Sequence, residues 1–188
     1  EMCIRDRYNG VRDFFASRGI TLPEGDPSDG PAAQTICGLG NRKNDLFNTV
    51  LARDGIQPYP GSRRWVDRLH ESGMAMAVVS SSRNAAAVLK AAGMVEDFSV
   101  LVDGNRSKTE RLPGKPAPDT YLRGAELLGV PAEQCVVVED AVSGVRAGAA
   151  GGFGMVLGVN RGVGADRLRE AGADRVVDDL DEMVEEMA

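Results

Sequence analysis

Leu112-Pro-Gly-Lys-Pro-Ala-Pro-Asp119 is followed, about one helix later, by Val136-Val-Val-Glu-Asp140. Upstream of both lies Val78-Val-Ser-Ser-Ser-Arg-Asn84. A hydroxyl group, a lysine and an acidic pair thus follow an apolar run or precede a helix, in that chain order. Such a set of groups can hold a phosphoryl group and a divalent cation.

From residue 58 onward, apolar segments alternate with helical patterns. A continuous apolar run predicts a buried strand at 74–79, and further strands are expected at 99–102, 135–138, 155–157 and 175–177. The alternation predicts an α/β fold, a three-layer Rossmann-like parallel sheet with helices on both faces. Because ligands gather at the carboxyl ends of such strands, Ser80, Asp103 and the Glu139-Asp140 pair are expected to lie near one another.

Residues 8–57 have a different sequence pattern, with no alternation of strands and helices. Helical patterns at about 11–18 and 44–54 are separated by a turn-rich stretch at 23–31. They predict a partial α-helical cap domain over 8–57, followed by the α/β core over 58–188. Residues 1–7 have neither the apolar core nor the cleavage site of a signal peptide. They are interpreted as an adaptor-derived leader, and the natural chain is expected to begin further upstream.

Composition excludes several classes of function. A net charge of −6 argues against a nucleic-acid partner, and no apolar run approaches the roughly 18 residues that span a bilayer. Three scattered cysteines and a single histidine, His70, leave no material for a disulfide framework or for His-based metal and Ser-His-Asp chemistry. A cytoplasmic protein is expected. The oligomeric state cannot be read from the sequence.

Glu139 and Asp140 admit two interpretations. Two adjacent carboxylates at a strand end repel each other unless a cation is present, and Mg²⁺ accepts one or two carboxylates together with waters and phosphate oxygens. The alternative is a cap, since Asp140 directly precedes an expected helix over 141–150.

Lys115 and the serine run also have ordinary alternatives, as a surface charge and as helix capping by Ser82. The prolines on either side of Lys115 favour a fixed side chain, which would stabilise a phosphoryl group in a charged transition state. Hydroxyl and backbone N–H groups over 80–84 would form an anion site at a helix start.

These stretches resemble the haloacid dehalogenase superfamily. Ser80, Lys115 and Glu139-Asp140 match its second, third and fourth motifs, and the flanking residues resemble its β-phosphoglucomutase branch. The resemblance implies that Ser80 binds a phosphoryl oxygen, that Lys115 neutralises the phosphoryl group, and that Asp140 with Glu139 holds Mg²⁺. It also implies a distal phosphate site at Ser81, Ser82, Arg83 and Asn84, and cap contacts from Lys43 and Asn44.

One part of the family pattern is missing. The family nucleophile belongs to a strand that ends in Asp-x-Asp, and the chain has no such strand at the fitting place. Asp103 lacks the second carboxylate, and the Asp-x-Asp at 179–181 comes last in the chain. In the family fold the absent strand lies between those ending at Ser80 and Asp140. Its removal is expected to leave an apolar slot, unpaired backbone groups and a chain that folds poorly or aggregates.

The resemblance therefore implies a Mg²⁺-dependent phosphotransferase acting on a small sugar phosphate through an aspartyl-phosphate intermediate. It would be β-phosphoglucomutase-like or a sugar-phosphate phosphatase, and this chain is expected to be an inactive fragment of it. The alternative is a non-catalytic phosphate-binding or interaction module.

Overall fold

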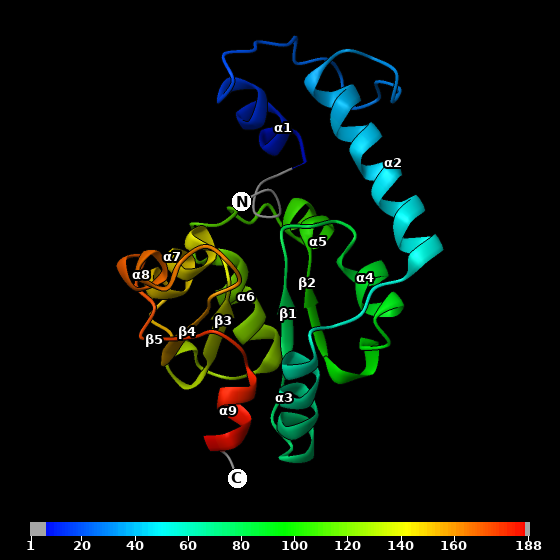
Figure 1. Ribbon diagram of the computed structural model, residues 1–188. Coiled ribbons are helices and arrows are strands. Elements are labelled where there is room, and N and C mark those ends of the chain that lie inside the picture. Colours follow the sequence, from blue (N-terminus) through cyan, green and yellow to red (C-terminus); the bar gives the residue numbers. More distant parts are fainter. Residues whose placement is uncertain (1–6, 187–188) are drawn as a thin grey trace. The chain divides into compact units, whose positions relative to one another are not determined.

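The computed structural model describes residues 7–186, which fold as two compact units that divide between Ile56 and Gln57. Figure 1 shows the helices of the first unit in blue and cyan, and the strands and helices of the second in green to red. Each unit is described separately below.

The first unit contains α1 (Arg7–Ala16) and α2 (Ile36–Asp54), which pack against each other. Both helices begin earlier than their apolar patterns indicated. Thr35 explains the start of α2, because its hydroxyl accepts a hydrogen bond from the N–H of Gly38 and so caps the helix. Arg7, assigned to the leader from the sequence, lies in α1 and donates to the side chains of Asn41 and Asn44.

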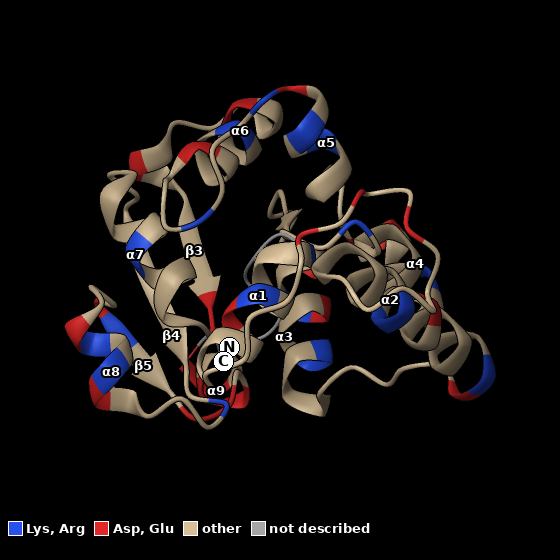
Figure 2. Cartoon of the chain, turned by 90° about the horizontal axis from the view of Figure 1, so that it is seen from above, with Lys and Arg blue, Asp and Glu red and all other residues tan. Residues whose placement is uncertain are grey.

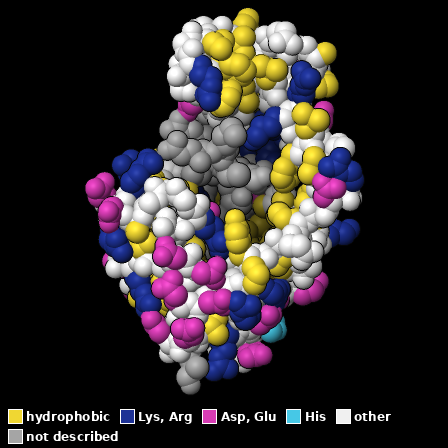
Figure 3. Space-filling view, in the orientation of Figure 1, with side chains coloured by type: hydrophobic (Ala, Val, Ile, Leu, Met, Phe, Trp, Pro, Cys, Tyr) yellow, Lys and Arg dark blue, Asp and Glu magenta, His cyan; other side chains and the backbone are white. Residues whose placement is uncertain are grey.

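The apolar positions of α2 that predicted the helix are largely exposed. Leu46 is 60% exposed, and Phe47 and Val50 are 40% and 47% exposed. Apolar side chains are visible along this helix in Figure 3. The pattern therefore identified the helix, but it did not identify a buried face.

The second unit alternates strands and helices, as expected from the sequence. Short 3₁₀ turns at Val95–Asp97 and Ala132–Gln134 interrupt the alternation. The strands are β1 (Ala77–Val79), β2 (Val100–Val102), β3 (Val136–Glu139), β4 (Met155–Val159) and β5 (Arg175–Val177). The helices are α3 (Pro60–Glu71), α4 (Ala85–Ala91), α5 (Gly104–Thr109), α6 (Asp119–Leu128), α7 (Val142–Ala150), α8 (Ala165–Glu170) and α9 (Asp181–Glu186).

All strand pairs are parallel, but they form two sheets. β1 pairs with β2, with Val78 opposite Leu101, while β4 pairs on its two sides with β3 and β5. In the described part of the chain no ladder joins β1 to β3. This is the position where the sequence analysis expected a central strand to be absent. The parallel α/β fold class is confirmed, and its sheet is divided between β1 and β3.

The three-stranded sheet is covered on both faces. Successive residues of its strands point to opposite sides, so Val137 and Val156 join one apolar cluster with Tyr121 of α6 and Leu168 of α8. Leu157, Val159 and Val177 join a second cluster with Trp65 of α3 and Met183 of α9. Helices α6, α7 and α8 therefore form one outer layer and α3 and α9 the other.

Helix α6 connects the two sheets. It packs against β1 and β2 and also against α7, which itself covers β3 and β4. Val79, at the end of β1, packs onto the apolar cluster of the three-stranded sheet. The two sheets are thus held together by side-chain packing, because no backbone hydrogen bonds join them within residues 7–186.

Two further observations concern the helices. His70 is exposed in the last turn of α3, where the sequence placed it on the surface. None of the helices in residues 7–186 is long and apolar enough to cross a membrane.

Candidate active site

The serine run turns sharply after β1. The N–H of Ser80 donates to the carbonyl oxygen of Val102, which continues the ladder, and the hydroxyl of Ser80 accepts from the N–H of Ser82 at 3.1 Å. The hydroxyl of Ser82 accepts in turn from the N–H of Asn84. The hydroxyl groups therefore organise this loop locally. Ser82 does not cap α4, whose cap position is Asn84.

The loop is fixed against the start of α5. The carbonyl oxygen of Ser82 accepts from the N–H of Gly104, and that of Arg83 accepts from the side-chain amide of Asn105. A Cβ at Gly104 would lie 2.6 Å from the carbonyl oxygen of Ser81, so only glycine allows this approach. The residues predicted to contact a distal phosphate, Ser81 to Asn84, thus form one compact loop.

Lys115 is a buried side chain. Only 6% of it is exposed, because the loop before α6 directs it inward. Its ammonium donates to the carbonyl oxygen of Val79 at 3.4 Å and forms an ion pair with Glu139. The surface alternative for Lys115 is therefore wrong. One ammonium group lies at the carboxyl ends of both β1 and β3.

Glu139 accepts four hydrogen bonds. Its Oε1 accepts from the Lys115 ammonium and from the Tyr121 hydroxyl, the latter at 2.8 Å. Its Oε2 accepts from the N–H groups of Asp140 and Ala141, both at 3.0 Å. Since Ala141 is the cap residue of α7, the carboxylate at the helix start belongs to Glu139. The capping role that the sequence suggested for Asp140 is wrong, because the cap position of α7 is Ala141 and no described side chain caps the helix.

Asp140 is exposed, and among the described residues no protein donor is recorded on its carboxylate. Figure 2 shows the acidic end of β3. Glu139 and Asp140 line a pocket of about 200 Å³, together with Val138, Val159, Arg161 and Leu180.

A magnesium ion fits this arrangement in part. Among residues 7–186 no group of three or more Asp, Glu, His or Cys side chains could hold a metal ion by itself. Mg²⁺ commonly binds one or two carboxylates and completes its six ligands with waters and substrate phosphate. Asp140 can supply such a ligand, whereas each oxygen of Glu139 already accepts two protein hydrogen bonds.

Tyr121 is the site residue that sequence reasoning missed. Its side chain is buried beside Phe153, and its ring lies 4.5 Å from the Lys115 ammonium. Burial, followed by the negative charge of Glu139, raises the pKa of Tyr121 well above its usual value. The sequence feature that could have identified Tyr121 as a site residue is its position six residues after Lys115, inside the first two turns of the next helix.

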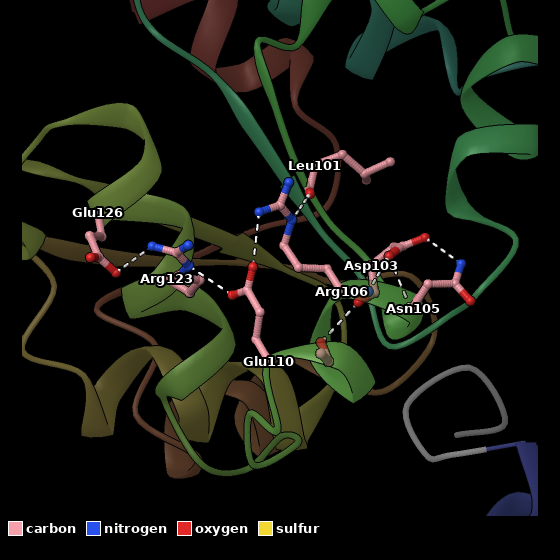
Figure 4. Close-up of polar contacts among 8 residues, drawn as sticks. Leu101, Asp103, Asn105, Arg106, Glu110, Arg123 and Glu126 are labelled. Atoms are coloured by element: carbon pink, nitrogen blue, oxygen red, sulfur yellow. Dashed lines mark hydrogen bonds and ion pairs between the residues drawn. The ribbon is translucent and has the colours of Figure 1, made fainter.

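Asp103 has a structural role. Its carboxylate caps α5 by accepting from the N–H groups of Asn105 and Arg106, and it accepts again from the Asn105 side chain, as Figure 4 shows. The side chain is 8% exposed. These contacts agree with the sequence-based decision not to assign Asp103 as the nucleophile.

The structure brings Lys115 and Glu139 into contact and places Lys115 against the residue that precedes Ser80. The predicted cap residues belong to the other unit. There Lys43 is exposed on α2, and the side chain of Asn44 accepts from Arg7. The site described here lies entirely within the second unit.

Comparison with known proteins connects this geometry to a family. Residues 4–152 match the family model described as haloacid dehalogenase-like hydrolase. A β-phosphoglucomutase of Mycobacterium bovis is 48% identical over 183 residues, which are 96% of this chain and 70% of that protein. Hexitol phosphatase A of Escherichia coli is 39% identical over 132 residues, which cover 69% of this chain and 57% of the phosphatase.

Solved structures show the same fold. The crystal structure of a β-phosphoglucomutase from Clostridium difficile matches with a TM-score of 0.70 at 20% identity, covering 99% of this chain and 92% of that one. The ordered motifs, the parallel α/β core and these relatives agree. The chain belongs to the haloacid dehalogenase-like hydrolases, an enzyme family, and to their β-phosphoglucomutase-like branch.

Proposed function

We propose that this chain carries the phosphate-binding and Mg²⁺-binding half of a phosphotransferase site that acts on small sugar phosphates. The observation that supports the proposal is the position of Lys115. Its buried ammonium contacts both Glu139 and the carbonyl oxygen of Val79, the residue before Ser80. A fixed positive charge between two strand ends stabilises a phosphoryl group in its charged transition state.

Each residue then has a defined task. The hydroxyl of Ser80 donates a hydrogen bond to a phosphoryl oxygen, and Lys115 neutralises the charge of the phosphoryl group. Asp140, together with Glu139, holds Mg²⁺. When bound, Mg²⁺ neutralises charge and positions the phosphate oxygens. A second, distal phosphate of the substrate binds the loop formed by Ser81, Ser82, Arg83 and Asn84, and the cap residues Lys43 and Asn44 contribute from the first unit.

The relatives support the substrate class. They include a protein named β-phosphoglucomutase and one named hexitol phosphatase A, and both names refer to phosphorylated sugars or sugar alcohols. In the proposed reaction an aspartate oxygen attacks the phosphorus of the sugar phosphate, and the bond between phosphorus and the sugar oxygen breaks. An aspartyl-phosphate forms, while the sugar oxygen takes up a proton and leaves as a hydroxyl group. A cytoplasmic location suits such a substrate.

This chain on its own is proposed to bind but not to turn over substrate. No described strand ends in Asp-x-Asp at the place where the nucleophile is expected, and the sheet is divided there. A non-catalytic phosphate-binding module is the second candidate, and the same observation favours it. Turnover of a sugar phosphate by a longer polypeptide that contains this sequence would exclude the non-catalytic module.

Isothermal titration of the full chain with MgCl₂ and with inorganic phosphate tests the proposal. Asp140→Asn is expected to abolish Mg²⁺ binding, and Lys115→Met to weaken phosphate binding at least tenfold. Asp166→Asn is the matched control, because Asp166 is an exposed carboxylate on α8 that contacts Arg169. Equal Mg²⁺ affinity in the wild type and Asp140→Asn would exclude Asp140 as the ligand.

A further inference from the structure

Tyr121 contacts both partners of the Lys115–Glu139 ion pair. Its hydroxyl donates to Oε1 of Glu139 at 2.8 Å, and its ring lies 4.5 Å from Nζ of Lys115. The residue is 7% exposed, and its ring packs edge-on against Phe153. One rigid, buried side chain on α6 therefore contacts the acidic end of β3 through its oxygen and the lysine through its aromatic face.

The hydroxyl has a specific effect on Glu139. The carboxylate accepts two hydrogen bonds on each oxygen, which uses the four acceptor positions that a carboxylate offers. If the hydroxyl is removed, one position of an almost buried oxygen loses its donor, and the carboxylate can turn toward water.

The ring has a separate effect on Lys115. A cation near an aromatic face is attracted by the negative charge density of the ring, most strongly where water is excluded. The ammonium therefore has three contacts that keep it at the strand ends: the Tyr121 ring, Glu139 and the carbonyl oxygen of Val79. Phenylalanine at position 121 would keep the ring and lose the hydroxyl, so the two effects can be separated.

We propose that Tyr121 is a positioning residue of this site: its hydroxyl sets the orientation of Glu139 next to the cation ligand Asp140, and its ring holds Lys115 for the phosphoryl group. This rests on the proposed function and adds to it a residue outside the motifs that identified the family. Tyr121 itself contacts neither cation nor phosphate, and acts through its two neighbours.

Four variants of the full chain test the assignment by isothermal titration with MgCl₂ and with inorganic phosphate. Tyr121→Phe is expected to weaken Mg²⁺ binding at least fivefold and to leave phosphate binding within twofold of the wild type. Tyr121→Leu is expected to weaken both. A general loss of packing would weaken both affinities, so it would not explain a variant that loses Mg²⁺ affinity and keeps its phosphate affinity.

The other two variants are controls. Tyr8→Phe removes a hydroxyl group that donates a hydrogen bond to the side chain of Asn41 in the first unit, and it should change neither the Mg²⁺ nor the phosphate affinity. Phe153→Leu removes the ring packed against Tyr121 and should lower thermal stability while keeping both affinities within twofold. Unchanged Mg²⁺ affinity in Tyr121→Phe, or an equal loss in Phe153→Leu, would overturn the assignment.

Hydrogen exchange separates failure of this inference from failure of the proposed function. The N–H groups of Asp140 and Ala141 bond to Glu139, so their exchange reports the orientation of its carboxylate without any ligand. Exchange at these two amides should be at least tenfold faster in Tyr121→Phe than in the wild type. If the wild type binds no Mg²⁺, the metal part of the proposed function is wrong, and unchanged exchange in Tyr121→Phe would then overturn the role of Tyr121 as well.

Discussion

Lys115 and Glu139 form an ion pair across the line where the sheet is divided, with side chains that are 6% and 11% exposed. Each partner comes from a segment that the sequence identified separately. The pair joins the loop before α6 to β3 of the three-stranded sheet, and α6 itself packs on the two-stranded sheet. It therefore carries both a candidate catalytic role and a structural one.

Removing the charge of Lys115 is expected to cost about 3 kcal/mol of unfolding free energy, because a buried carboxylate then loses its cation. Lys115→Met should show this loss in urea denaturation. Arg169→Met, which removes an exposed pair with Asp166, should cost less than about 1 kcal/mol. The double variant Lys115→Met/Glu139→Gln should cost less than the sum of the single changes. Simple additivity would show that the two groups are not coupled.

Gly144 leaves room for the Glu139 carboxylate. A Cβ at this position would overlap the carboxyl carbon and both of its oxygens. Helix propensity alone favours alanine over glycine by about 1 kcal/mol inside α7. We expect Gly144→Ala to destabilise the chain by about 1–3 kcal/mol instead, because Glu139 must leave its four donors. Thermal denaturation shows whether Gly144→Ala raises or lowers the stability of the chain.

Gly30 provides the control for this substitution. A Cβ there meets no atom within 4 Å, so Gly30→Ala should be close to neutral. If Gly144→Ala is as stable as the wild type, the carboxylate does not occupy the position described here.

The open edges of β1 and β3 lead to a prediction about association. Unpaired strand edges with apolar side chains recruit other strands, and Val136 at the start of β3 is 53% exposed. The chain is expected to aggregate with rising concentration, as followed by light scattering. Val136→Lys should reduce this aggregation, because a lysine on an edge strand opposes pairing.

Val95→Lys is the matched control, since Val95 is 46% exposed in a 3₁₀ turn and not in a strand. Equal protection by both substitutions would point to net charge as the cause. A cooperative thermal transition without concentration dependence would contradict the prediction itself.

The sequence predicted the fold class because strand and helix periods are local properties. Continuous apolar runs located all five strands of the described core, although β1 is only Ala77–Val79, shorter than the expected 74–79. In α2 the apolar residues predicted the helix, and Leu46, Phe47 and Val50 are exposed on it. Burial depends on which other segment covers a face, and periodicity alone does not contain that information.

The candidate site, too, was predicted from the sequence only in part. Motif spacing selected Lys115 and Glu139, but it could not tell which of two adjacent carboxylates would turn inward. Glu139 does so because its side chain reaches the start of α7, while Asp140 stays exposed. Tyr121 was missed because a tyrosine in an amphipathic helix usually indicates packing, and its hydrogen bond depends on how α6 meets β3.

Glu110 predicts an acid-dependent loss of stability. It lies between Arg106 and Arg123, in the chain of ion pairs shown in Figure 4. The hydrogen bond from Arg123 lowers the pKa of Glu110 below its usual value of 4.5. Its stabilising effect is therefore present above about pH 4.5 and is lost as the pH falls through the lower folded-state pKa.

The melting temperature measured from pH 6 to pH 3 should consequently fall more steeply for the wild type than for Glu110→Gln. Glu71→Gln, at an exposed end of α3 where Arg68 is 3.7 Å away, should follow the wild type. Parallel curves for the wild type and Glu110→Gln would show that this cluster does not determine the acid response.

The last prediction concerns turnover. With Mg²⁺ and a generic phosphate ester, the chain should release no inorganic phosphate above background, because no described strand of its core ends in Asp-x-Asp at the place expected for the nucleophile. Asp103→Asn gives a clean check, since asparagine caps helices about as well as aspartate and can accept from the same two N–H groups. The variant should therefore fold normally. If the chain hydrolyses the ester and Asp103→Asn abolishes the activity, Asp103 is the nucleophile and its capping contacts must break during the reaction.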